Sequence, residues 1–126
     1  MIKSFVKSAA ACGTIVTLSM STFTGAFADK LDDVIDAGLV RCGVVLDFPP
    51  IGYRDANNEP AGFDVEYCKD LAAAMEVDHE IIPLTWAERL PSIVSNRADV
   101  VFGGTSDTLE RAKTVGFTIP YAIYYA

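Results

Sequence analysis

The strongest constraint on the fold is an alternation of short apolar strands with helical segments along residues 31–119. Apolar runs predict the strands, and apolar residues at helical spacing predict the helices. The predicted strands cover residues 39–46, 80–84, 98–102 and 114–119, and the predicted helices cover residues 31–37, 63–77, 86–95 and 108–113. Such alternation is typical of an α/β fold with a mainly parallel sheet flanked by helices. In such sheets ligands bind beyond the carboxyl ends of the strands.

The first 28 residues have the pattern of a secretory signal peptide. Lys3 and Lys7 form a basic start, an apolar run follows, and Ala26-Phe27-Ala28 gives a cleavage site of small residues before Asp29. A lipoprotein would use Cys12 instead, but no Leu stands three residues before it. We therefore expect cleavage after Ala28, export to the periplasm, and a mature chain that starts at residue 29.

The charge of the chain argues against a nucleic-acid partner. The net charge is −7, and loss of residues 1–28 would leave eight basic against 17 acidic residues, a net charge of −9. A chain this acidic has no basic stripe for phosphates.

Residues 29–126 suffice for one small domain, but they end on an apolar aromatic run from Ile119 to Tyr125, which suggests that more protein follows.

The cysteines and the single histidine give no metal-binding pattern. Cys42 and Cys68 remain after cleavage, and in an oxidising compartment they could pair. Each could equally be a small buried hydrophobic residue, because the sequence does not show whether their Cα atoms lie within about 7 Å. There is no Cys-x-x-Cys, and His79 is the only histidine, at the polar start of a predicted strand. We expect no metal and no cofactor.

The segment from Gly103 to Arg111 is the best candidate for a binding site. Two glycines allow a ligand to approach the backbone closely, and Asp107 with Glu110 predicts an N-cap and a capping box for a helix near Thr108. Arg111 would then lie in the first turn, where the helix dipole disfavours a cation. An anion held by Arg111, Ser106 and backbone N–H groups would explain this placement, although Arg111 could also be a solvated surface residue.

Several motifs in order resemble the amino-acid-binding branch of the bacterial periplasmic solute-binding proteins, family 3. The motifs run along nearly all of the mature chain: Phe48-Pro49-Pro50-Ile51-Gly52-Tyr53-Arg54-Asp55, Gly62-Phe63-Asp64-Val65, Trp86-Ala87-Glu88-Arg89-Leu90-Pro91, Ala98-Asp99-Val100-Val101, and Gly103 through Tyr121. The resemblance implies a periplasmic-binding-protein type II lobe, a protein that closes on an amino acid and delivers it to an ABC transporter permease. It implies a monomer when full length.

The resemblance also assigns roles to individual residues. Arg111 would hold the ligand carboxylate with two parallel hydrogen bonds, which a Lys could not do. Ser106 and the backbone at Gly103 and Gly104 would complete the polar contacts, while Phe48 and Trp86 would pack against the ligand side chain. Core packing is the alternative role for both aromatic residues.

The chain departs from the family pattern in two respects. Val45 stands where many relatives carry an acidic residue, which disfavours a basic ligand side chain, although Asp47 is nearby. The family's second lobe is absent, so residues 29–126 would be the N-terminal part of the first lobe, with half a cleft.

Two other functions stay open. One is an enzyme similar to periplasmic cyclohexadienyl dehydratases, for which Asp47 and Glu88 are candidate acid or base groups. The other is a truncated product that binds nothing. We expect a binding protein rather than an enzyme.

Overall fold

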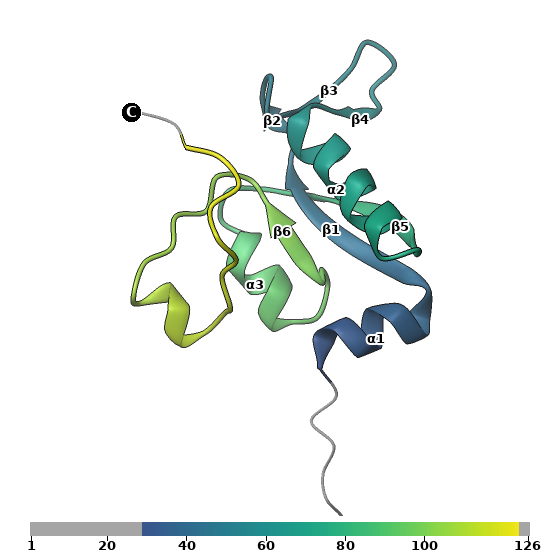
Figure 1. The fold of residues 1–126 in the computed structure, drawn as a ribbon. Helices are drawn as coiled ribbons and strands as arrows, with labels where there is room; N and C mark the ends of the chain where they lie inside the picture. Colours follow the sequence, from purple (N-terminus) through teal and green to yellow (C-terminus); the bar gives the residue numbers. More distant parts are fainter. Residues whose placement is uncertain (1–28, 124–126) are drawn as a thin grey trace, which may run out of the picture.

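A three-stranded parallel sheet organises the structure, a computed structural model that describes residues 29–123 (Figure 1). The central strand is β1 (Leu39–Val45), which pairs in parallel with β5 (Asp78–Leu84) on one side and with β6 (Val100–Phe102) on the other. The predicted α/β fold with a parallel sheet is therefore confirmed.

Three helices flank this sheet. Helix α1 (Lys30–Ala37) precedes β1, α2 (Phe63–Ala74) links β1 to β5, and α3 (Arg89–Val94) links β5 to β6. The connection through α2 leads from the central strand β1 to the edge strand β5. The connection through α3 leads from β5 past β1 to the opposite edge strand, β6. Because such connections are right-handed, the two helices cover opposite faces of the sheet.

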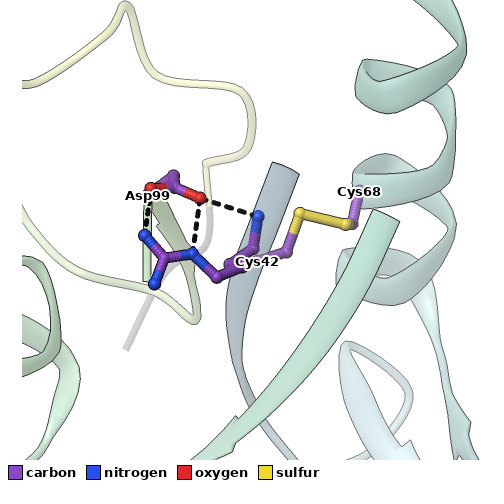
Figure 2. The surroundings of a disulfide bond; sticks show 4 residues. Cys42, Cys68 and Asp99 are labelled. Atoms are coloured by element: carbon purple, nitrogen blue, oxygen red, sulfur yellow. Dashed lines mark hydrogen bonds and ion pairs between the residues drawn. A yellow bond between two sulfur atoms is a disulfide. The ribbon is translucent and has the colours of Figure 1, made fainter. Parts of the chain in front are cut away.

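Alternate residues of β1 build the core beneath α2. Val40, Cys42 and Val44 are at most 2% exposed and pack with apolar residues of α2. Cys42 forms a disulfide with Cys68 of α2, with 6.2 Å between their Cα atoms, so the pairing that the sequence left open is present. Figure 2 shows this bond running from β1 to the helix, with Asp99 on the side of Cys42 away from Cys68.

A buried carboxylate ties the start of the sheet together. Asp99 precedes β6, and its side chain is 5% exposed. It pairs with Arg41 of β1 at 2.8 Å and with Lys30 of α1 at 2.9 Å, and it also accepts a hydrogen bond from the Arg41 backbone N–H. Burial alone would raise the pKa of Asp99, but these hydrogen bonds lower it to about 2.

A small antiparallel sheet follows the carboxyl end of β1. It contains β2 (Asp47–Phe48), β3 (Gly52–Arg54) and β4 (Pro60–Ala61), which pair antiparallel in chain order as a small hairpin region. A Cβ at Gly52 would lie 2.2 Å from the carbonyl oxygen of Val45, so only glycine allows β3 to fold back this closely on the end of β1. The hairpin thereby places Phe48 beside the sheet's carboxyl edge.

Two predicted elements near the end of the described chain are wrong. The helix predicted over residues 108–113 is only a 3-10 turn, η1 (Arg111–Lys113), and Asp107 does not cap it. A short helix needs an apolar face packed on the protein, and Leu109 is 89% exposed. No strand forms over residues 114–119, where Ile119 is 87% exposed.

The remaining differences concern boundaries and coverage. Helix α3 is shorter than the predicted 86–95, so Trp86 lies in the turn before it, and α2 ends at Ala74 rather than near Val77. Within residues 29–123, no helix is long and apolar enough to cross a membrane. The predicted signal peptide and the last residues, 124–126, lie outside the described part of the chain.

Candidate ligand-binding site

The candidate site lies at the carboxyl ends of β1 and β6. The connections from β1 and β5 run in opposite directions across the sheet, so the strand order reverses at this point. Ligands of open α/β sheets bind in the crevice beyond the strands at such a reversal. The segment after β1 carries Phe48, and the segment after β6 carries Gly103 through Arg111.

Phe48 and Trp86 form an aromatic pair at this edge. Their ring centroids are 5.5 Å apart in an edge-to-face arrangement, and the two residues are 39% and 41% exposed. The guanidinium of Arg89, in the first turn of α3, lies 4.9 Å from the centre of the Trp86 ring, and its Nε donates to the Trp86 carbonyl. A cation over an aromatic face and a hydrogen bond to the same residue hold Trp86 in place. The exposed aromatic surface is suited to contact with an apolar part of a ligand.

The same arginine holds the double-glycine turn. Arg89 Nη1 donates to the carbonyl oxygens of Gly103 at 2.7 Å and Gly104 at 3.2 Å. Gly103 has a φ of +137°, and a Cβ on it would lie 3.1 Å from Val45 Cγ2, so the turn is one that glycine suits. Val45 is thus a buried support beneath the turn, 2% exposed. Arg89 therefore links two groups of predicted site residues, Phe48 with Trp86 and Gly103 with Gly104.

Ser106 and Arg111 form a second group. Arg111 Nη1 donates to the backbone carbonyl of Ser106 at 2.9 Å. Because η1 is a single 3-10 turn, Arg111 does not occupy the first turn of an α-helix, and the expected conflict with a helix dipole is absent. Arg111 lines a hollow with Leu90 and Thr114, next to the larger cavity described below.

A cavity of about 580 Å³ lies between β6 and the segment of residues 115–123. The glycine turn and Ser106 line one part of it, and the rest is mainly apolar, with Val100 and Ile119 among its residues. This volume is in the range of small-molecule sites. Residues 115–119 line this cavity and do not pair with β6, in agreement with the absence of a strand there.

The two candidate acid or base groups differ in their surroundings. Glu88 accepts hydrogen bonds from the backbone N–H and the hydroxyl of Thr85, both at 2.8 Å, and from Arg97 at 2.9 Å. The Thr85 backbone bond is the main cause that lowers the pKa of Glu88 to about 2, with Arg97 next. In its ionised form, Glu88 thus fixes the turn before α3. Asp47 is exposed on β2, paired with Tyr53 in the small sheet.

Three residues of the site region were not predicted as functional. Arg89, Asp64 and Tyr121 all stand in the motifs that carry the family resemblance, but without an assigned role. For Arg89 a signal was present: a cation three residues after Trp86 lies on the same face of a helical turn. For Asp64 and Tyr121 there was none, because their contact joins residues 57 positions apart. Within residues 29–123, no cluster of His, Cys, Asp and Glu side chains could hold a metal ion.

Comparison with known proteins connects this geometry to a family. Residues 40–126 match the sequence profile of the bacterial extracellular solute-binding proteins, family 3. Cyclohexadienyl dehydratase of Pseudomonas aeruginosa is 30% identical over 92 residues, which cover 73% of this chain and 34% of the enzyme. The L-cystine-binding protein TcyJ of Escherichia coli K12 is 32% identical over 99 residues, which cover 77% of this chain and 37% of that protein.

A solved structure of an amino-acid-binding domain has a similar fold. The arginine-bound form of domain 1 from TmArgBP, the arginine-binding protein of T. maritima, superposes with a TM-score of 0.68 and 34% identity and covers 71% of each chain. The fold is that of a type II periplasmic binding protein domain. The chain spans about a third of the length of the two curated relatives. By the extent of its sequence match and by its fold, the chain belongs to the bacterial extracellular solute-binding proteins, family 3.

Proposed function

We propose that the protein binds a free amino acid outside the cytoplasm and delivers it to an ABC transporter permease. The main observation is the double-glycine turn, which Arg89 holds beside Phe48 and Trp86 at the sheet's carboxyl edge. An amino acid has an invariant charged end and a variable side chain. A polar turn next to an exposed aromatic pair offers one surface for each.

Arg111 is the proposed anchor of the ligand carboxylate. A guanidinium carries five N–H donors, and the bond from Nη1 to Ser106 leaves capacity for a carboxylate. The bond to Ser106 also fixes the guanidinium next to the segment that carries Gly103 and Gly104. We propose that closure around the ligand completes the site with this arginine, the Ser106 hydroxyl and the backbone of the turn.

Phe48 and Trp86 are the proposed contacts for the ligand side chain. Val45, which replaces an acidic residue of many relatives, lies buried beneath Gly103 and offers no charge to the site. The arrangement supports a neutral ligand side chain over a basic one. Two named relatives, a cystine-binding protein and an arginine-binding protein, show that members of the family differ in ligand.

A thermal-shift screen with individual amino acids tests this function. Binding to the native state alone stabilises a protein by about 2.7 kcal/mol at a ligand concentration of 100 Kd. We expect at least one amino acid to raise the midpoint of unfolding, and Arg111→Ala to abolish that rise.

The matched control is Arg54→Ala. Arg54 also donates from Nη1 to a backbone carbonyl, that of Asn58 at 2.9 Å, but it lies in the exposed hairpin away from the turn. This variant should keep the full response to the ligand. An Arg111→Ala protein that responds like the wild type would refute the role of Arg111, and a wild type that responds to no amino acid would refute the function.

The route to the periplasm is a separate part of the proposal. We propose that residues 1–28 are a signal peptide removed after Ala28, and a disulfide in the core supports an oxidising compartment. N-terminal sequencing of the protein from a periplasmic extract should start at Asp29. An intact mass from the same extract gives the length of the native product and thus tests whether a truncated chain exists.

The arginine-bound single domain of TmArgBP supports ligand binding even by one domain.

Cyclohexadienyl dehydratase activity is the second candidate, because one relative of similar identity is that enzyme. Catalysis needs a positioned acid or base, and Glu88 is held as an ion by Thr85 and Arg97. This argues against Glu88 as the acid. Incubation with prephenate or arogenate decides the question: formation of phenylpyruvate or phenylalanine would establish the enzyme.

A further inference from the structure

The double-glycine turn is contacted from a second side by a tyrosine that lies 18 positions later in the chain. The backbone N–H of Gly103 donates to the hydroxyl of Tyr121 at 3.4 Å, while the carbonyl of Gly103 accepts from Arg89 on α3. The Tyr121 hydroxyl in turn donates to Asp64 Oδ1 at 3.1 Å. One hydroxyl therefore joins the turn to a carboxyl group on α2.

We propose that Asp64 and Tyr121 are positioning residues that hold the Gly103–Gly104 turn in its ligand-binding conformation. We call this pair the Asp64–Tyr121 latch. The inference rests on the proposed amino-acid binding, and it adds two residues that act through the turn rather than by contact with the ligand.

Asp64 is a rigid support for the latch. It lies in the first turn of α2 with 0% exposed surface, and its backbone N–H donates to the carbonyl of Ile51 at 2.8 Å. The other carboxyl oxygen, Oδ2, is buried and has no hydrogen-bond partner. A buried polar group of this kind is costly, which is a reason to look for a function rather than a packing role.

Burial changes the titration of both groups of the pair. Burial raises the pKa of Asp64 to about 6, against the opposing effect of the Tyr121 hydrogen bond. Burial, followed by the charge of Asp64, raises the pKa of Tyr121 to about 12, so the hydroxyl keeps its proton and donates to Asp64 once that carboxylate is ionised. The next charged residues along α2, Glu66 and Lys69, pair with each other at 2.8 Å on the exposed surface.

Packing holds the ring of Tyr121 independently of its hydroxyl. The ring stacks on Tyr67 at 5.2 Å and on Phe63 at 6.1 Å, and it meets Phe102 edge to face at 5.9 Å. Tyr121→Phe should therefore keep the ring in place and remove only the latch. Tyr67→Phe removes a hydroxyl from the same aromatic cluster without touching the latch, and it serves as the matched control.

The first measurement needs no ligand. In ¹⁵N-labelled protein we expect the Gly103 amide to exchange with solvent about 5-fold to 10-fold faster in Tyr121→Phe than in the wild type, as the loss of one hydrogen bond implies. Its resonance in the wild type should shift with a midpoint near pH 6 as Asp64 ionises. The shift should vanish in Asp64→Asn, which keeps an acceptor for Tyr121 but does not titrate.

The second measurement is the affinity for the amino acid found in the thermal-shift screen. Tyr121→Phe should weaken binding by about 3-fold to 10-fold, and Tyr67→Phe should not. Faster exchange with unchanged affinity would overturn the positioning role, and unchanged exchange at Gly103 would overturn the latch itself. If the wild type binds no amino acid, the proposed function fails, while faster exchange in Tyr121→Phe still supports the latch as a structural contact.

Discussion

Replacement of Asp99 by alanine is expected to lower the free energy of unfolding by about 3 kcal/mol. The carboxylate is 5% exposed, and its removal leaves Arg41 and Lys30 without their shared anion and the Arg41 backbone N–H without its acceptor. This loss of stability lies at the lower end of the range for buried ion pairs, because Arg41 and Lys30 keep 33% and 41% of their side-chain surface exposed. Urea denaturation at pH 7 measures it.

The control for Asp99 is an ion pair of the same length on the surface. Glu66 and Lys69 are 2.8 Å apart, but the Glu66 side chain is 66% exposed, so Glu66→Ala should change stability by less than about 1 kcal/mol. Equal effects of Asp99→Ala and Glu66→Ala would mean that burial does not strengthen the Asp99 cluster.

The effect of Asp99→Ala should also depend on pH. The folded-state pKa of Asp99, about 2, lies below its ordinary value of 3.8, so the ionised group stabilises the fold above about pH 4. This contribution, about 2 kcal/mol, is lost as the pH falls from about 4 to 2. The difference between wild type and variant should therefore shrink over that interval, and a constant difference would contradict the assignment.

Loss of the Cys42–Cys68 disulfide is expected to destabilise the protein by about 3.5 kcal/mol. The bond closes a loop with a sequence separation of 26, and the chain-entropy relation gives about this value for such a loop. Both cysteines are 0% exposed, so a reductant should reach the bond only when the protein opens. Urea denaturation with and without reductant, after equilibration in each denaturant concentration, gives the difference.

A variant with both Cys42→Ala and Cys68→Ala provides the control for this measurement. Its unfolding midpoint should be low and should not respond to reductant, because nothing remains to be reduced. A wild-type midpoint that is also insensitive to reductant would show that the two thiols are not joined.

Local pattern predicted the parallel sheet well, because β1 is an apolar run that is buried along most of its length and β5 contains an apolar stretch from Ile81 to Leu84. The same pattern failed after β6. Residues 108–113 have the capping signature of a helix, but Leu109 finds no apolar surface, so tertiary packing does not support the helix. The pairing of Cys42 with Cys68 depended on a distance of 6.2 Å that only the folded chain defines.

The position of the candidate site at the strand ends was predictable, but the contacts that join its parts were not. Phe48 and Trp86 contact each other at one edge of the sheet, and the glycine turn follows the neighbouring strand β6. Arg89, which links them, contacts Trp86 only three positions away, a pairing that helical spacing could have revealed. Its other partners, the carbonyls of Gly103 and Gly104, lie 14 and 15 positions away, and no short motif reveals that contact. The ligand-binding roles of all the predicted site residues remain predictions: Phe48, Trp86, Gly103, Gly104, Ser106 and Arg111.

The two outer edges of the parallel sheet differ in their resistance to aggregation. The outer strand β5 contains Pro83, which cannot donate a hydrogen bond, and it starts with the charged and polar residues Asp78, His79 and Glu80. The opposite edge strand, β6, consists of Val100, Val101 and Phe102, and within residues 29–123 no strand pairs with its outer edge. An apolar, unguarded edge is a template for strand addition between molecules. During expression of these residues alone, soluble yield will therefore depend on what covers β6, and a lysine in place of exposed Ile119 beside it is the first substitution to try for better solubility.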